Sequence, residues 1–194
     1  ILLDVVRRTA EKVFMPLTVG GGIKSVEDAK ALLRAGADKV AIGTGGPRAI
    51  SEVATAIGSQ AVVAVLDVKD GYAYVNCGST RTVQSAIAWA RCCEDHGAGE
   101  ILLTSIDREG MMNGYDLDLL RAVSDSVSLP VIAHGGAGTY YHMLQAIEAG
   151  ADAGVPIRLG SRLVGALTAR WPAGRSVPAD RQAVLQCAAA VIAA

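Results

Sequence analysis

Pro16-Leu17-Thr18-Val19-Gly20-Gly21-Gly22-Ile23 decides the fold of this chain, because a second version of the segment begins at Pro130, at an offset of 114 residues. The second copy reads Pro130-Val131-Ile132-Ala133-His134-Gly135-Gly136-Ala137-Gly138. After a helical stretch, each copy reaches the same Gly-Ala-Asp triplet, at residues 36–38 and 150–152. Internal repetition of this kind constrains the whole architecture. A strand, a glycine turn and a helix repeated at this distance predict a half-barrel duplication within a (β/α)8 TIM-barrel type of fold, a member of the α/β class.

The hydrophobic pattern predicts strands that alternate with helices. Apolar runs rich in β-branched residues indicate strands buried on both faces, as in a parallel sheet. They lie at 14–19, 39–43, 61–67, 100–105, 130–134 and 153–159, and helical patterns lie at 1–13, 25–35, 47–57, 84–96, 116–127 and 139–149. Residues 70–82 differ, because Asp70-Gly71 followed by alternating residues predicts a hairpin. Such alternation of strands and helices indicates βαβ units with right-handed crossovers.

Three helix starts carry recognisable signals. Ser25 with Asp28 three residues later resembles a capping box in which Asp replaces Glu. Pro47 stands near the favoured first position of its helix, and Thr139 precedes the last one.

About six β/α units are visible rather than eight, and no interdomain linker interrupts them. We therefore expect residues 1–194 to form a single partial barrel, with 155–194 as a divergent C-terminal segment that ends in a helix over 179–193. The first residue is Ile1, inside a helical pattern, which is typical of a fragment or a trimmed chain. Six strands cannot close with the shear of an eight-stranded barrel, so we expect exposed strand edges, distorted closure or self-association through those edges.

Composition excludes several classes of partner. The net charge of −1 leaves no basic footprint for nucleic acid or for an anionic membrane surface. No uncharged apolar run reaches the ~20 residues of a membrane span, and no signal segment opens the chain. The four cysteines, Cys77, Cys92, Cys93 and Cys187, lack the spacing of a metal site, so we expect reduced thiols in a cytoplasmic protein with neither metal nor cofactor.

Glycine turns follow the strands at which a barrel of this type binds ligands. The candidate phosphate-binding residues are Gly21, Gly22, Gly43, Thr44, Gly135 and Gly136. Without a Cβ, backbone N–H groups can approach an anion, and the following helix N-terminus favours negative charge. Tight turns need glycine in any case, so one cluster is weak evidence. Two clusters at equivalent positions predict a substrate that is phosphorylated at both ends.

Polar side chains at strand ends are the candidates for chemistry. Asp67 closes an apolar strand, where it acts either as a general acid or base or as a structural carboxylate that accepts bonds from loop amides. Thr104 can donate a hydrogen bond to substrate, although threonine also suits a strand. Of Asp107 and Glu109, we expect one to cap a turn and the other to face a ligand. His134 is either a phosphate contact or an accidental neighbour; His96 and His142 are expected to face solvent.

Four segments together resemble the cyclase subunits of imidazole glycerol phosphate synthase. They are residues 14–23, 58–63, 97–108 and 132–138, and the stretch from Gly97 to Asp107 is highly specific. The resemblance extends from the start of the chain to about Ala153. It implies a duplicated (β/α)8 barrel in histidine biosynthesis, a lyase that uses ammonia to close the imidazole ring of a bis-phosphorylated ribulosyl aminoimidazole carboxamide nucleotide.

The resemblance also implies roles for individual residues. Asp67 matches one of two general acid–base aspartates, and the other belongs to a first strand that these residues do not contain. One phosphate is implied at Gly22 with Gly43-Thr44, and the other at Gly135-Gly136 with the turn after the last strand. Thr104, Glu109 and Gly110 match substrate contacts. Lys39 and Glu100 match two members of a charged gate at the opposite barrel end, through which a glutaminase partner supplies ammonia.

Several residues depart from the family pattern. Gly43 replaces a usual Asn and His134 a usual Ser, and Glu109 stands where the family usually has Asp. Together with Val68-Lys69-Asp70 and residues 74–78, the changes at Gly43 and His134 favour paralogues implicated in amidating sugars of surface polysaccharides. After Ala153 the last strand is not recognisable, and a changed reading frame would explain this. The alternatives are therefore such a paralogue, or a non-catalytic partial barrel that binds phosphate or partner chains. We expect the isolated chain not to turn over.

Overall fold

A computed structural model describes residues 3–43, 45–152, 156–159 and 162–166. Thr44 and the helix expected over 179–193 lie outside these residues. The chain divides into two compact units, Ile1–Leu102 and Leu103–Ala194. The expectation of one partial-barrel domain over residues 1–194 stays a prediction.

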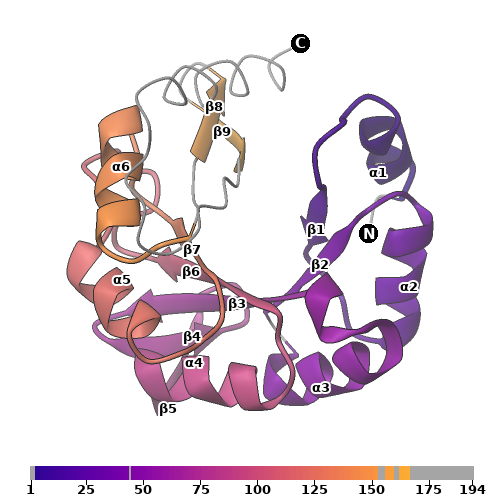
Figure 1. Cartoon of the computed structure of the whole chain (residues 1–194), viewed down its shortest axis with the longest axis horizontal. Coiled ribbons are helices and arrows are strands. Elements are labelled where there is room, and N and C mark those ends of the chain that lie inside the picture. The colour runs from indigo at the N-terminus through magenta and orange to yellow at the C-terminus, as the bar shows by residue number, and fades with distance from the viewer. Residues whose placement is uncertain (1–2, 44, 153–155, 160–161, 167–194) are drawn as a thin grey trace. The chain divides into compact units, whose positions relative to one another are not determined.

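The first unit is built from parallel strands that alternate with helices (Figure 1). Strands β1 (Thr18–Gly20), β2 (Lys39–Ile42) and β3 (Val62–Lys69) pair in parallel, with Thr18 opposite Lys39 and Val40 opposite Val62. The helices are α1 (Leu3–Ala10), α2 (Val26–Arg34), α3 (Gly46–Ile57) and α4 (Ala86–Asp95), with a short 3-10 turn at Ser59–Ala61. This order confirms the α/β fold class and the parallel sheet.

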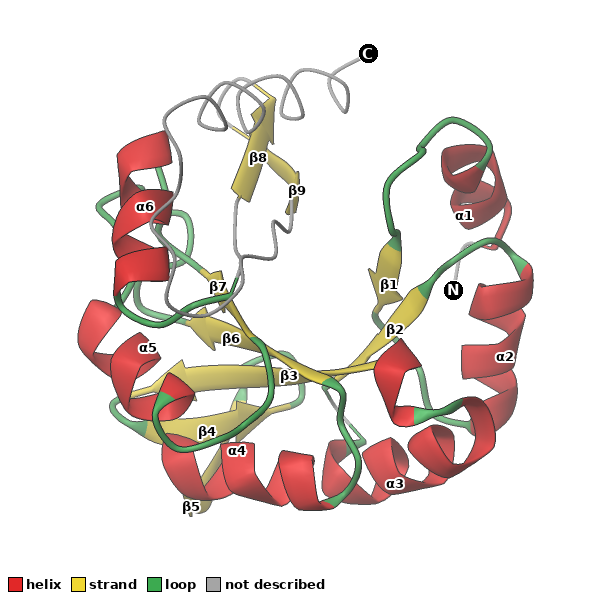
Figure 2. Ribbon diagram, viewed as in Figure 1, coloured by secondary structure: helices red, strands yellow, loops and turns green. Residues whose placement is uncertain are grey.

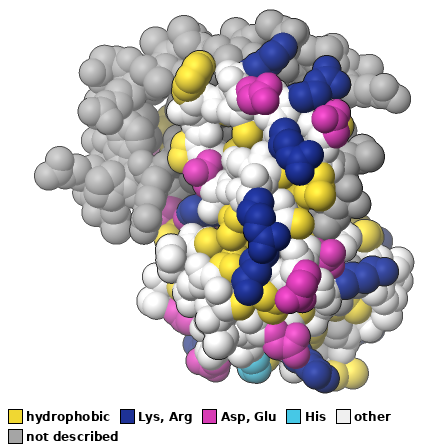
Figure 3. Space-filling model, turned by 90° about the vertical axis from the view of Figure 1, so that its right-hand side faces the viewer, with side chains coloured by type: hydrophobic (Ala, Val, Ile, Leu, Met, Phe, Trp, Pro, Cys, Tyr) yellow, Lys and Arg dark blue, Asp and Glu magenta, His cyan; other side chains and the backbone are white. Residues whose placement is uncertain are grey.

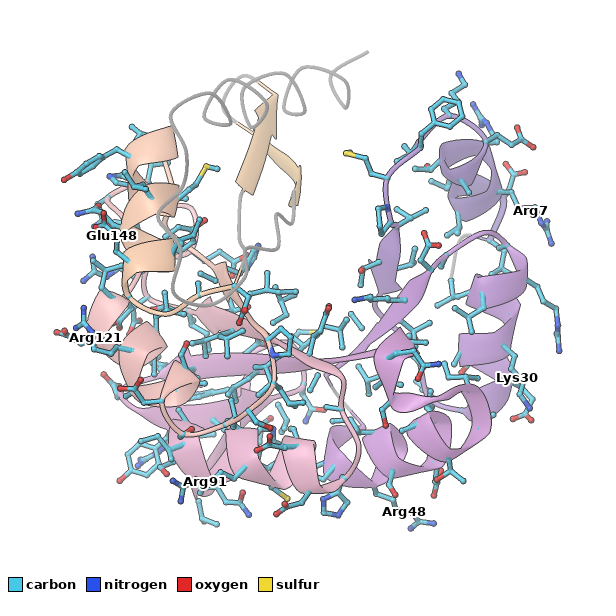
Figure 4. The ribbon with its side chains drawn as sticks, in the orientation of Figure 1. Arg7, Lys30, Arg48, Arg91, Arg121 and Glu148 are labelled. Atoms are coloured by element: carbon cyan, nitrogen blue, oxygen red, sulfur yellow. The ribbon has the colours of Figure 1, made fainter. Side chains whose placement is uncertain are left out.

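Successive side chains of β3 point to opposite faces of the sheet, which places Asp67 on the face opposite Leu66 and Val68. Val62, Ala64, Leu66 and Val68 are all buried, and they form one face of the strand. Buried residues of the helices, among them Leu32, Ile50 and Val53, complete this core. The opposite face of β3 carries Val63, Val65 and Asp67. The labelled charged side chains Arg7, Lys30 and Arg48 of the helices point away from the strands (Figure 4).

The hairpin expected over residues 70–82 is confirmed. Strands β4 (Tyr72–Val75) and β5 (Thr80–Ser85) extend the sheet in antiparallel fashion beyond β3 (Figure 2). Asp70 and Gly71 have φ values of 50° and 76°, the left-handed conformation that a tight two-residue hairpin turn requires. The Arg81 guanidinium lies 3.8 Å above the centre of the Tyr72 ring, and this cation–π interaction stabilises the pairing of β4 with β5.

The second unit repeats the strand–helix pattern. Strand β6 (Glu100–Ser105) begins in the first unit, ends in the second and there pairs with β7 (Val131–His134). Helices α5 (Leu117–Ser124) and α6 (Tyr140–Glu148) follow these strands. Leu103, Leu120, Val123, Val131 and Met143 are buried and form the core of this unit.

Two strands differ from the sequence expectation. The strand expected over 14–19 begins only at Thr18, because Pro16 has no N–H group for a ladder and Phe14 is fully exposed. Of the expected strand 153–159, the structure describes β8 (Pro156–Leu159). This strand does not join the main sheet but forms an antiparallel pair with β9 (Arg162–Ala166).

The helices of the repeat end in the same way in both units. The N–H of Ala37 donates to the carbonyl of Leu32 at 3.1 Å, and the N–H of Ala151 donates to that of Ala146 at 2.9 Å. The intervening glycines have φ values of 107° and 103°, which an alanine tolerates poorly.

The aspartates of the two Gly-Ala-Asp triplets hold equivalent strands. Asp38 Oδ2 accepts from the backbone N–H of Leu17 at 2.7 Å, and Asp152 Oδ2 accepts from that of Val131 at 3.2 Å. The two copies of the repeat therefore share these hydrogen bonds as well as their Gly-Ala-Asp sequence.

Candidate functional site

Asp67 lies near the carboxyl end of β3 and is half-buried. It lies on the same strand face as Val63, which is buried, and Val65, which is half-buried. In the sheet it stands opposite Tyr74 of β4. The hairpin that follows therefore fixes the backbone on which this carboxylate stands. A carboxylate held at a strand end and partly open to solvent can transfer protons.

The first glycine turn is open. Gly21 and Gly22 have φ values of 96° and 73°, and both are exposed. A Cβ placed on Gly21 would meet no atom within 4 Å. Gly43 follows β2 and is half-buried beside Val65; its predicted partner Thr44 lies outside the described residues. This turn needs glycine for its backbone conformation and leaves space for an anion beside it.

The second glycine turn is covered. Gly135 and Gly136 have φ values of 85° and 103°, as the repeat predicts, but both are buried. A Cβ on Gly135 would lie 2.7 Å from the carbonyl oxygen of Ser105, and one on Gly136 would lie 2.3 Å from that of Gly114. The N–H of Gly114 donates to the carbonyl of Gly136 at 2.8 Å. The loop between β6 and α5 therefore packs directly on this turn.

Thr104 and His134 are brought together. Thr104 Oγ1 lies 3.3 Å from His134 Nδ1, at the carboxyl ends of two paired strands. Thr104 is only 4 % exposed, whereas His134 is half-buried. The hydrogen bond orients the imidazole of His134 beside the second glycine turn. Its contact with phosphate stays a prediction.

A small cavity adjoins His134. Its lining includes Ser105, Tyr115, Asp116, Ala133 and His134. Burial raises the pKa of Tyr115 far above its ordinary value, so its hydroxyl stays protonated. Asp116 caps α5 by accepting from the N–H of Leu119 at 3.1 Å.

Glu109 and Gly110 lie in the turn after β6. The N–H groups of Arg108 and Glu109 both donate to the carbonyl of Ser105, at 3.1 Å each. Glu109 and Asp107 are exposed, and Gly110 has a φ of 75°. The roles expected for Glu109 and Gly110 as substrate contacts stay predictions.

Lys39 and Glu100 form an ion pair within the first unit. Lys39 Nζ donates to Glu100 Oε1, and the two side chains are 26 % and 14 % exposed. They stand at the first residues of β2 and β6, whereas Asp67 stands near the last residues of β3. Each partly buried charge compensates the other, because an unpaired one would be costly to desolvate.

Sequence reasoning missed the hydrogen bond of His142. This side chain is half-buried rather than facing solvent, and its Nδ1 accepts from the N–H of Gly138 at 3.1 Å. The repeat contained the signal, since His142 stands 114 residues after Asp28, whose carboxylate accepts from the N–H of Lys24 at 3.0 Å. The other helical histidine, His96, is exposed as expected.

Other chemistry-bearing groups do not gather in the described residues. Cys77, Cys92 and Cys93 are free thiols, and burial raises the pKa of Cys93 to about 12, so it is unreactive. Within the described ranges no three His, Cys, Asp or Glu side chains could together hold a metal ion. No helix in that part of the chain is long and apolar enough to cross a membrane. On the face seen in Figure 3, Lys and Arg side chains are interspersed with Asp and Glu.

Comparisons with known proteins identify the family to which the chain belongs. The model of a family described as "Histidine biosynthesis protein" matches residues 1–157. Over 163 residues the chain is 51 % identical to imidazole glycerol phosphate synthase subunit HisF of Desulfovibrio desulfuricans, covering 77 % of this chain. The chain spans 63 % of the length of that relative. The chain therefore belongs to the histidine biosynthesis protein family of TIM barrels.

Proposed function

We propose that the protein carrying this chain is a cyclase subunit of imidazole glycerol phosphate synthase. The substrate is a bis-phosphorylated ribulosyl aminoimidazole carboxamide nucleotide, and ammonia closes its imidazole ring. The observation that carries the proposal is the 51 % identity to a subunit of that name. The position of Asp67 near the carboxyl end of β3, where the sheet fixes its backbone, supports the proposal.

Asp67 is the proposed general acid or base of the ring closure. A carboxylate in this role exchanges protons with the substrate as bonds to ammonia form and break, and such a group contributes about 10²–10⁴-fold to a rate. Thr104, His134, Glu109 and Gly110 are the proposed substrate contacts. Thr104 and His134 already share a hydrogen bond, which reduces the freedom that substrate binding would have to remove.

Phosphate groups are proposed to bind at the two repeated glycine turns. Gly21 and Gly22 form the first site with Gly43 and Thr44, and Gly135 and Gly136 contribute to the second. We propose weaker binding at the second turn, because the segment expected to complete it reads Val155-Pro156-Ile157 and proline has no N–H to donate. The loss corresponds to about 1–3 kcal/mol at the strength of charge-assisted hydrogen bonds.

Ammonia is proposed to arrive from a glutaminase partner past Lys39 and Glu100. These residues begin their strands, at the opposite strand ends from Asp67. Their ion pair would close the entrance, and passage would require the partners to separate.

The isolated 194 residues are proposed not to turn over, because the resemblance assigns the second acid–base aspartate to a strand outside them. The test therefore joins the chain to the N-terminal segment of the D. desulfuricans relative and follows ammonia-dependent consumption of the nucleotide. Asp67→Asn should lower the rate at least about 10²-fold, since general acid–base groups contribute that much.

Asp70→Asn is the matched control. Asp70 is exposed and has a φ of 50°, which asparagine adopts readily, so this variant should retain the parental rate. A full rate in Asp67→Asn would contradict the assignment of Asp67. Activity of the unextended chain would contradict the proposed inactivity.

A second candidate is a paralogue that uses ammonia to amidate a sugar. Gly43 and His134, which stand where the resembled cyclases usually have Asn and Ser, favour this candidate together with Val68-Lys69-Asp70 and residues 74–78. The same extended protein, offered a sugar in place of the nucleotide, distinguishes the two. Phosphate binding with no turnover of either substrate would instead indicate a non-catalytic scaffold.

A further inference from the structure

His142 occupies a position that links the second glycine turn to the preceding loop. In α2 the capping box uses Asp28, whose Oδ2 accepts from the N–H groups of Lys24 and Ser25 at 3.0 and 3.1 Å. The equivalent residue of α6 is His142, whose Nδ1 accepts from Gly138. The equivalent hydrogen bond is therefore present in both copies, with a carboxylate as the acceptor in α2 and an imidazole in α6.

The geometry points to His142 as a positioning residue, which holds the second glycine turn and the loop over residues 106–116 in the arrangement that binds a phosphate group. This inference rests on the proposed phosphate sites. His142 acts through Gly138 and Gly114, because its ring is hydrogen-bonded to the first and lies beside the second.

The imidazole must be in one protonation form to do this. A backbone N–H can only donate, so Nδ1 of His142 carries no proton when it accepts from Gly138, and the neutral ring carries its proton on Nε2. The N–H of His142 itself donates to Thr139 Oγ1 at 3.4 Å, the N-cap hydrogen bond of α6.

The ring also limits the movement of the covering loop. A Cβ on Gly114 would lie 3.7 Å from the His142 ring, which is ordinary contact distance. Gly114 in turn donates to the carbonyl of Gly136 at 2.8 Å, and Gly138 lies against the carbonyl of Met112. The His142 ring is therefore hydrogen-bonded to the turn at Gly138 and lies near Gly114 of the loop.

Without the ring, two glycines at this junction would lose their lateral support. Glycine has more accessible backbone conformations than any other residue, so Gly114 and Gly138 would move more freely. A phosphate at Gly135-Gly136 would then have to order both segments on binding, and its affinity would fall.

The test is a titration of the whole chain with inorganic phosphate, followed by the amide NMR signals of both glycine turns. His142→Ala should weaken binding at Gly135-Gly136 about fivefold, the equivalent of one hydrogen bond of about 1 kcal/mol, and leave Gly21-Gly22 unchanged. Asp28→Ala is the matched control and should change only the first turn. His142→Asn should restore binding at the second turn, because its amide oxygen can accept from Gly138.

Equal phosphate affinity of His142→Ala and the parent at the second turn would overturn the inference. A parent chain that binds phosphate at the first turn alone would also overturn it. If the parent binds phosphate at neither turn, the proposed phosphate sites fail. Hydrogen exchange then decides the inference: the Gly114 and Gly138 amides should exchange faster in His142→Ala and recover in His142→Asn. Unchanged exchange would overturn it.

A measurement on the parent chain covers the case in which His142→Ala does not fold. The ¹⁵N shift of His142 Nδ1 at neutral pH should be that of an unprotonated imidazole nitrogen. A protonated Nδ1 would contradict the hydrogen bond on which the inference stands.

Discussion

The two glycine turns of the repeat share a backbone conformation but not an environment. Gly21 and Gly22 are exposed, and a side chain on Gly21 would point into open space. Gly135 and Gly136 are buried beneath the loop that follows β6, with carbonyl oxygens where their Cβ atoms would be. The difference teaches that glycine at the second turn is required by packing as well as by φ. Its presence there is consequently weaker evidence for phosphate binding than the same residue at the first turn.

The largest contrast is expected between alanine substitutions in the two turns. Gly136→Ala combines a φ of 103° with a Cβ 2.3 Å from a carbonyl oxygen of rigid backbone. It should lower the free energy of unfolding by about 3–5 kcal/mol, as strain and overpacking together cost. Gly21→Ala has only the strained φ and should cost about 1–2 kcal/mol. Urea denaturation measures both, and equal losses would show that the second turn is not tightly covered.

A smaller contrast is expected between the two aspartates that hold strands. Asp38 is exposed, so water can replace it at the N–H of Leu17. Asp152 is half-buried and Val131 is fully buried, so removing this carboxylate leaves a donor with little access to water. Asp152→Ala should cost about 1–3 kcal/mol and Asp38→Ala about 0.5–1.5 kcal/mol, although the Asp38 bond is the shorter one.

Thermal unfolding of the two aspartate variants tests this order. Asp125→Ala is a suitable control, since Asp125 is exposed at the end of α5. If Asp38→Ala were the more destabilising variant, bond length rather than burial would govern these contacts.

The smallest expected effect is a difference in acid sensitivity between the caps of α2 and α6. Hydrogen bonds from the backbone of Lys24 and from Ser25 lower the pKa of Asp28 below its ordinary value of 3.8. Since the pKa is lowered in the folded chain, the stabilisation is complete above pH 3.8 and is lost as the pH falls through the folded value.

Hydrogen exchange of the Lys24 and Ser25 amides, followed with decreasing pH, measures this loss. Asp28→Asn should show exchange that lacks the acid-dependent step, because its amide does not titrate. The cap of α6 contains His142 in the equivalent position and so has no carboxylate to protonate there. An acid-dependent step that persists in Asp28→Asn would assign it to another group.

Local signals predicted most of the elements because each depends on neighbours in the chain. Ser25 and Asp28 form the predicted capping box, with the Asp28 N–H donating to Ser25 Oγ at 3.2 Å. Asp70-Gly71 makes the predicted hairpin turn, since few residue pairs adopt two consecutive left-handed conformations. The late start of β1 was not predicted, because an apolar run does not show that the ladder begins only after Pro16.

The candidate site was predictable only in part, because local signals place residues but not the contacts between distant ones. The strand pattern placed Asp67 and Thr104 at strand ends, and the repeat placed the glycine turns and His134 there; the roles of these residues stay predictions. The hydrogen bond between Thr104 and His134 joins residues 30 positions apart, and the Lys39–Glu100 ion pair joins residues 61 apart. No local pattern encodes a contact between side chains on separate strands.

The sequence by itself determined most of the local structure of this protein: most of the strands, the caps, the left-handed glycines and the repeat that makes Asp38 and Asp152 equivalent. These features follow from hydrophobic periodicity and from φ preferences, which act within a few residues. Only the tertiary structure decided that Gly136 is covered while Gly21 is open, and that His142 replaces a carboxylate as the acceptor for Gly138. The burial and the hydrogen-bond partners of a residue depend on which distant segment packs against it. Identical residues in the two copies of the repeat therefore have different neighbours.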